Sequence, residues 1–175
     1  MKKFLTLSLA LLAGCLIAAE IQLYPMARPN KYISGFALHK DAQYYWFMFQ
    51  LTPEAPQDLV IDCLYVNTDK DKNTGRKKVG NEYYVVAAKN SITAYTKEGK
   101  EIGGRKKVYS FRTPNWQMIR VNADAFTANP ITDYCFIWWR NKVVNGSVLI
   151  APEKKFTTAE LPTLPELPVK AAKKK

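Results

Sequence analysis

Oxygen-bearing side chains alternate along one short acidic loop, at Asn67, Asp69, Asp71 and Asn73. This spacing lets a tight loop turn several oxygens inward, and hard cations such as calcium bind several oxygen ligands. An EF-hand is excluded, because a loop starting at Asp69 has Thr74 at the glycine position and Gly80 at the position of the bidentate acid. Two interpretations remain: a calcium site made by the four alternating residues, or a network of Asx turns at the strand ends.

Exposed aromatic side chains are the second chemical feature, because an aromatic ring offers a flat apolar surface with polar groups beside it. Successive strand side chains point to opposite faces, so Trp138 and Trp139 lie in different layers. Arg140 is two residues after Trp138, so both side chains point to the same face of the strand. The charge of Arg140 indicates that this face is the one nearer to water. The candidates for ligand binding are Trp116, Trp138, Tyr44 and Arg140. The alternative for each of them is core packing.

Catalysis has little support in the sequence. His39 is the only histidine, and nothing near it suggests a partner for a serine or cysteine nucleophile. The acids are few and fall mostly in loops, and there is no glycine-rich phosphate loop. We therefore expect a binding protein that is not an enzyme and has no cofactor other than calcium.

The elements that must position these residues are short β-strands. Runs rich in aromatic and β-branched residues are divided by Pro, Gly, Asn and Asp, without a long segment of helical period. Tight turns are expected at 97–100 and 145–146, and one helical turn capped by Asn122 at 122–126. The pattern predicts an antiparallel two-sheet β-sandwich, jelly-roll-like, with about ten strands at 20–24, 32–39, 42–51, 59–67, 83–88, 91–96, 106–112, 116–121, 133–140 and 147–150.

The N-terminus has the layout of an export signal. Lys2 and Lys3 precede an apolar run, which is too short to span a membrane, and small residues follow it. One interpretation is cleavage after residue 19. The other is a lipoprotein signal, 1–14, in which Cys15 is lipidated and becomes the mature N-terminus. The expected location is periplasmic, membrane-anchored through that lipid, or secreted.

Two cysteines remain after the signal, Cys63 and Cys135, and both lie in apolar runs. Export makes a disulfide between them chemically feasible, and two strand cysteines can meet across a sandwich. The alternative is a pair of free buried thiols. Two cysteines alone do not make a structural zinc site, which takes four ligands.

The net positive charge is divided between the domain, residues 20–150, and a tail of different composition. The whole chain carries +11, and residues 20–150 hold 18 basic and 12 acidic residues, a net charge of +6. Nucleic acid is a poor match for an exported protein of moderate charge, whereas an anionic polysaccharide or membrane surface fits the compartment. Residues 151–175 contain repeated Leu-Pro steps and a lysine-rich end, which predicts a disordered, extended tail.

Residues 42–87 resemble the family-nine-like carbohydrate-binding modules and the wider DOMON-like β-sandwiches. The similarity includes the aromatic strand 44–49, the apolar strand 59–66 and the Asn-Thr-Asp-x-Asp-x-x-Thr-Gly loop. Its matching positions are Asn67, Thr68, Asp69, Asp71, Thr74, Gly75, Gly80, Glu82 and Tyr83. Asn67 and Glu82 each depart from an aspartate in that pattern. The resemblance implies a jelly-roll-like sandwich that binds a polysaccharide or glycan; the alternative is an envelope accessory domain that binds a protein partner.

Overall fold

The computed structural model describes residues 23–24, 26, 30–105, 108–132, 134–140 and 144–150. The predicted signal segment, with Cys15, and the tail predicted to be disordered lie outside the described residues.

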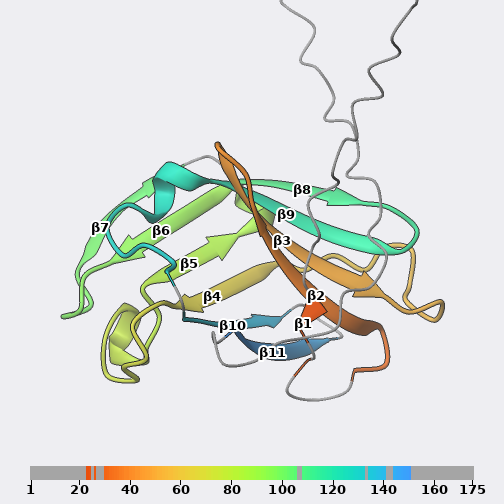
Figure 1. The fold of residues 1–175 in the computed structure, drawn as a ribbon, viewed down its shortest axis with the longest axis horizontal. Helices are drawn as coiled ribbons and strands as arrows, with labels where there is room; N and C mark the ends of the chain where they lie inside the picture. The colour runs from red at the N-terminus through yellow and green to blue at the C-terminus, as the bar shows by residue number, and fades with distance from the viewer. Residues whose placement is uncertain are drawn as a thin grey trace, which may run out of the picture.

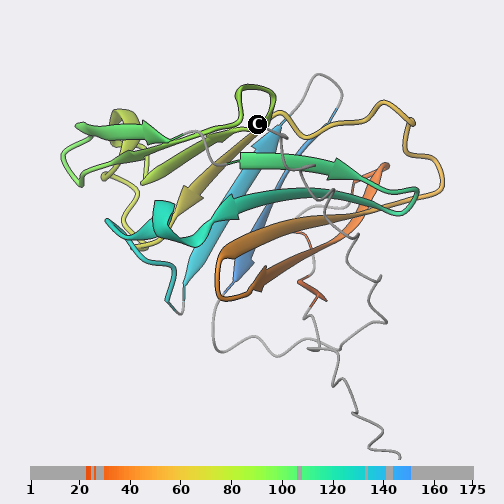
Figure 2. The ribbon, with the colours of Figure 1, turned by 90° about the horizontal axis from the view of Figure 1, so that it is seen from above.

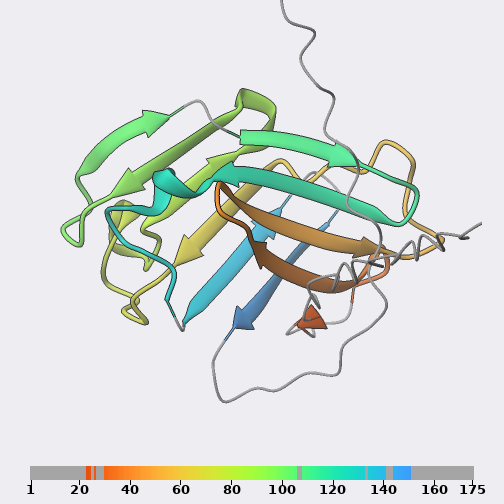
Figure 3. The ribbon, with the colours of Figure 1, turned by 45° about the horizontal axis from the view of Figure 1, so that its top comes forward.

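The chain folds into two antiparallel sheets that pack face to face, which confirms the predicted all-β sandwich (Figure 1 and Figure 3). The five-stranded sheet has the order β1 (Leu23–Tyr24), β2 (Ile33–Lys40), β3 (Tyr44–Leu51), β9 (Trp116–Asn122) and β8 (Val108–Arg112). The six-stranded sheet has the order β11 (Asn145–Ile150), β10 (Cys135–Arg140), β4 (Cys63–Asn67), β5 (Tyr83–Val86), β6 (Ser91–Tyr95) and β7 (Glu101–Arg105). The helical segments are single 3₁₀ turns, η1 (Arg76–Lys78), η2 (Ala87–Lys89) and η3 (Ala123–Phe126).

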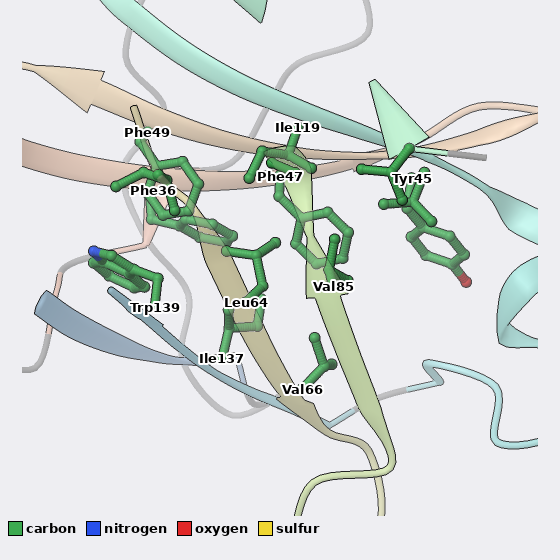
Figure 4. Packing of buried hydrophobic residues seen from close by; sticks show 14 of the residues in the cluster. Phe36, Tyr45, Phe47, Phe49, Leu64, Val66, Val85, Ile119, Ile137 and Trp139 are labelled. Carbon is green, nitrogen blue, oxygen red and sulfur yellow. The ribbon is translucent and has the colours of Figure 1, made fainter. Parts of the chain in front are cut away.

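Inward-facing side chains of both sheets meet in one core (Figure 4). Trp139 of β10 is fully buried in this core, with its ring stacked on Phe36 at 6.0 Å and edge-on to Phe49 at 5.0 Å. The parity argument for β10 is therefore correct in placing Trp138 and Trp139 in different layers. Aromatic pairs of this kind add about 0.5–1.5 kcal/mol to the stabilisation from buried area.

Four local expectations differ from the structure, the first being the strand expected at 59–67, which begins only at Cys63. Strand β7 was not expected, because its two glycines resemble a turn more than a strand. Asn145 and Gly146 are the first residues of β11 and not a hairpin turn. Gly146 lies under the indole of Trp139, and an added Cβ would sit 2.6 Å from that ring. A helical turn does follow Asn122, but the Asn122 side chain does not cap it.

Loops at the two ends of the sandwich extend the sheets. Residues 68–82, with the acidic segment, lie at one end beyond β4 and β5, and residues 52–62 lie at the opposite end (Figure 1 and Figure 2). Side chains that point away from the core form an outer face on each sheet. Both outer faces carry aromatic rings.

Candidate functional site

The acidic loop is held by hydrogen bonds from its own backbone amides. The side-chain oxygen of Asn67 accepts from the amides of Asp69 and Lys70, at 3.1 and 2.9 Å. Asp69 accepts from the amide of Asp71 at 2.9 Å, and Asp71 from that of Asn73 at 2.8 Å. These are successive Asx turns, in which each side chain fixes the backbone two residues further on.

Glu82 is the buried centre of this loop. Its carboxylate has no exposed area and accepts from the amide of Thr68 at 2.9 Å and from the hydroxyl of Thr74 at 2.9 Å. Burial raises the pKa of Glu82, and the two hydrogen bonds only partly oppose that effect. Gly75 closes the loop with a positive φ of 66°, and a Cβ there would lie 2.2 Å from the carbonyl oxygen of Asn81. Glu82 therefore fixes the loop to the end of the sheet.

The predicted metal ligands, Asn67, Asp69, Asp71 and Asn73, thus form an Asx-turn network. Among the described residues, no three His, Cys, Asp or Glu side chains are placed to hold a metal ion. The side-chain oxygen of Asn67 and one carboxylate oxygen each of Asp69 and Asp71 accept from backbone amides. Calcium binding stays a prediction.

Three aromatic rings form a row across the outer face of the six-stranded sheet. The register places Trp138 of β10 opposite Tyr65 of β4, and Tyr65 opposite Tyr84 of β5. The ring centroids are 4.5 Å apart for Tyr65 and Trp138 and 4.8 Å apart for Tyr65 and Tyr84, with interplanar angles of 35° and 28°. The rings therefore turn their faces toward one another. Arg76 ends the row, with its guanidinium 4.3 Å from the Tyr84 centroid.

The other end of the row is different, because the neighbour of Trp138 on β11 is Ser147. A serine leaves the indole face on that side without an aromatic neighbour across the strand. Trp138 is half-buried, Arg140 is exposed, and Asn145 lies opposite Arg140 in the register. An indole face, a guanidinium, a hydroxyl and an amide thus occupy one edge of the sheet. We call these four residues, Trp138, Arg140, Asn145 and Ser147, the Trp138 subsite.

The structure divides the four predicted ligand residues between opposite sides of the molecule. Trp138 and Arg140 share the subsite just described. Trp116 and Tyr44 lie on the outer face of the five-stranded sheet, and Trp116 is only 3% exposed. Trp116 is the first residue of β9 and directly follows the loop at 113–115. A ring with that exposure does not offer its face to a ligand.

The predicted disulfide between Cys63 and Cys135 is not formed, and both thiols are free and buried. Cys63 lies opposite Arg140 in the register of β4 and β10, which is five residues along β10 from Cys135. At about 3.4 Å per residue this separation is far beyond the reach of a disulfide. The two side chains also point to opposite faces: Cys135 is in the core, whereas Cys63 contacts the hydroxyl of Tyr84 at 3.4 Å.

Sequence reasoning missed several residues of the two outer faces. Tyr65 and Tyr84 complete the row with Trp138. The alternation of side chains along β4 could have predicted that Tyr65 points away from the core. The position of Arg76 over this row depends on the fold of the loop, which has no local sequence signal. On the opposite sheet, Trp46 and Arg120 were also missed.

A hollow of about 410 Å³ lies at the end opposite the acidic loop, between Thr52, Pro53, Ala55, Gln57, Arg112, Thr113 and Pro114. It contains none of the predicted ligand residues. The guanidinium of Arg112 donates to the carbonyls of Pro56 and Leu59, at 2.8 and 3.3 Å. This arginine therefore holds the neighbouring loop in place.

Within the described ranges, no helix is long and apolar enough to cross a membrane. No family model, curated protein or solved structure matches this chain. The similarity of residues 42–87 to carbohydrate-binding modules therefore stays a prediction from the motif.

Proposed function

We propose that this domain is a non-catalytic, carbohydrate-binding module of an exported protein, and that the Trp138 subsite holds the sugar. The observation that carries the proposal is the side of the Trp138 indole toward β11, which has only Ser147 as its cross-strand neighbour. A pyranose stacks its apolar face on an indole and forms hydrogen bonds with polar groups at its edge. Arg140, Asn145 and Ser147 are placed to supply those bonds.

The charge of Arg140 favours an acidic sugar within this class. A guanidinium binds a carboxylate through two parallel hydrogen bonds, which a neutral hydroxyl does not reproduce. Arg140 is exposed, and no acidic residue lies opposite it in the register of β4 or β11. A polysaccharide with uronic acid units is therefore the expected ligand.

Affinity gel electrophoresis tests the proposal with the chain from residue 20 onward, run through neutral and acidic polysaccharides. We expect retardation by an acidic polymer and its loss in Trp138→Ala. One stacked ring contributes roughly 1–3 kcal/mol, the range for bases stacked on aromatic side chains, or about a 5- to 150-fold change in Kd. Arg140→Gln is expected to reduce the preference for acidic over neutral polymers. Tyr109→Ala removes an exposed ring from the opposite sheet and serves as the matched control.

The same gels run with calcium and with a chelator test the predicted metal separately. If a chelator abolishes retardation, the acidic loop takes part in binding, although it lies apart from the Trp138 subsite. Retardation that survives Trp138→Ala would refute the assignment of this subsite. If no polymer retards the chain, the domain is better described as an envelope accessory domain that binds a protein partner.

A further inference from the structure

The outer face of the five-stranded sheet carries a second apolar layer, separate from the core. One cross-strand row runs over all five strands, through Leu23, Ala37, Met48, Met118 and Phe111. Trp46 and Trp116 lie on either side of this row, and the Trp46 indole donates to Asp41 at 2.8 Å. We call these seven residues, the five of the cross-strand row with Trp46 and Trp116, the methionine row.

The methionine row has the burial of a core, although every hydrophobic residue described in it belongs to the sheet's own strands. Ala37, Met48 and Met118 have no exposed area, and Trp46 and Trp116 are each 3% exposed. An outer face open to water rarely reaches such values from the sheet's own side chains, so we infer that this face has a cover.

A buried arginine beside the row, with two unsatisfied nitrogens, indicates the chemistry of that cover. Arg120 is 7% exposed, and its Nε and Nη1 atoms have no hydrogen-bond partner. Its guanidinium lies 4.2 Å from the Tyr44 ring centroid and 4.5 Å from that of Tyr109. Cation–π contacts replace only part of the lost hydration, and a buried guanidinium without an acceptor is costly. A carboxylate supplied with the cover would satisfy it.

The tail of this chain has the matching pattern. Residues 161–169 read Leu-Pro-Thr, Leu-Pro-Glu, Leu-Pro-Val, a repeat of three. Polyproline II has three residues per turn and rises about 3.1 Å per residue, so Leu161, Leu164 and Leu167 lie along one edge, about 9 Å apart. Neighbouring strands are about 4.8 Å apart, so this spacing equals two strands. The three leucines span about 19 Å, which is the width of a five-stranded sheet.

We propose that residues 161–169 of the same chain dock across the five-stranded sheet as a polyproline II segment, along the methionine row. Leu161 lies over the β1 and β2 side, Leu164 over Met48, and Leu167 over Phe111. Glu166 then falls beside Met118, next to Arg120 in the same strand, and gives its carboxylate to the free guanidinium nitrogens. Proline-rich segments bind aromatic-lined surfaces in this way because their extended backbone is already ordered.

The position where the described chain ends is consistent with this path. Ile150 closes β11, which contacts β1 at the edge of the five-stranded sheet. Ten residues separate Ile150 from Leu161 and extend to about 31 Å, enough to round that edge. The inference does not rest on the proposed carbohydrate function, since the Trp138 subsite is on the other sheet.

Oxidation of Met48 and Met118 by hydrogen peroxide, followed by mass spectrometry, measures whether the cover is present. The chain from residue 20 onward is used, so the predicted signal segment cannot act as the cover. We expect both methionines to be protected in this chain. Replacing Leu161, Leu164 and Leu167 by serine should raise their oxidation rates at least about tenfold. The matched control replaces Ala171 and Ala172 by serine in the same tail and should leave the rates unchanged.

A charge reversal tests the carboxylate. Glu166→Lys should expose the two methionines, whereas Glu153→Lys, the same change elsewhere in the tail, should not. Both changes lie outside the sandwich, so neither outcome depends on whether a variant folds.

Three results would overturn the proposal. They are rapid oxidation in the unaltered chain, equal protection in the triple serine variant, or protection that disappears on dilution. The last result would identify a second copy of the chain as the cover.

Discussion

Replacing Thr74 by valine should destabilise the domain more at pH 7 than at pH 4, because Thr74 serves a buried carboxylate. The Thr74 hydroxyl has one hydrogen, yet it lies 2.9 Å from Glu82 Oε1 and 3.0 Å from the carbonyl oxygen of Asp71. A protonated Glu82 relieves this competition, because its own O–H then donates to Thr74 Oγ1, and Thr74 donates to Asp71. Valine keeps the volume and removes the donor.

The size of this destabilisation depends on which acceptor loses the hydrogen bond from Thr74. A hydrogen bond to a charged group contributes about 1.5–3 kcal/mol, and a bond between neutral groups about 1 kcal/mol. We therefore expect Thr74→Val to cost roughly 2 kcal/mol with Glu82 ionised and roughly 1 kcal/mol with Glu82 protonated, so the cost should be larger at pH 7 than at pH 4. In the Glu82→Gln background the cost should be roughly 1 kcal/mol at both pH values.

The direction of the pH effect is fixed by the raised pKa of Glu82. A carboxyl whose pKa is higher in the folded than in the unfolded chain contributes stability at acidic pH, and that contribution is lost as pH rises through the folded pKa. Thr74→Val removes a hydrogen bond that lowers the pKa of Glu82, so the loss with rising pH becomes larger. Urea unfolding of the four variants at the two pH values measures this. Equal costs of Thr74→Val in both backgrounds would refute the coupling.

Three further outcomes are expected. Gly146→Ala should destabilise the domain by about 1–3 kcal/mol, because the new Cβ meets the Trp139 ring; a change within 0.5 kcal/mol would show that the indole moves aside freely. Cys63 and Cys135 should both alkylate in denaturant after export or mild oxidation, and a mass lower by two hydrogens would instead show a disulfide. In the folded chain Cys135 should stay unreactive, because burial raises the pKa of its thiol. Arg76→Ala should lower the free energy of unfolding by about 0.5–1 kcal/mol through the lost contact with two tyrosine rings, and Arg76→Lys by less, because lysine keeps the charge; equal losses in the two variants would contradict a cation–π contribution of the charge.

The strands were predictable because they depend on local alternation. Strand β3 combines inward Tyr45, Phe47 and Phe49 with outward Trp46 and Met48, and this run has only one reasonable secondary structure. Strand β7 was missed because two of its five residues are glycine, and its pairing with β6 gives it a structure that its own residues do not favour.

The site was less predictable, because a ligand surface depends on register and on which face is covered. Parity separated Trp138 from Trp139, but it did not place Tyr65 and Tyr84 beside Trp138. The alternating oxygens of the acidic loop suit a cation or a set of Asx turns equally well. The loop geometry directs them to backbone amides.

The sequence by itself determined the all-β class, most strand positions and the opposite orientations of Trp138 and Trp139, because these follow from the period of two in an extended chain. Only the tertiary structure decided that Cys63 and Cys135 stay apart, that the four aromatic and cationic candidates divide between two sheets, and that Arg120 is buried with its Nε and Nη1 unsatisfied. The physical reason is that these properties depend on strand order and register, which are set by contacts between residues far apart in the chain.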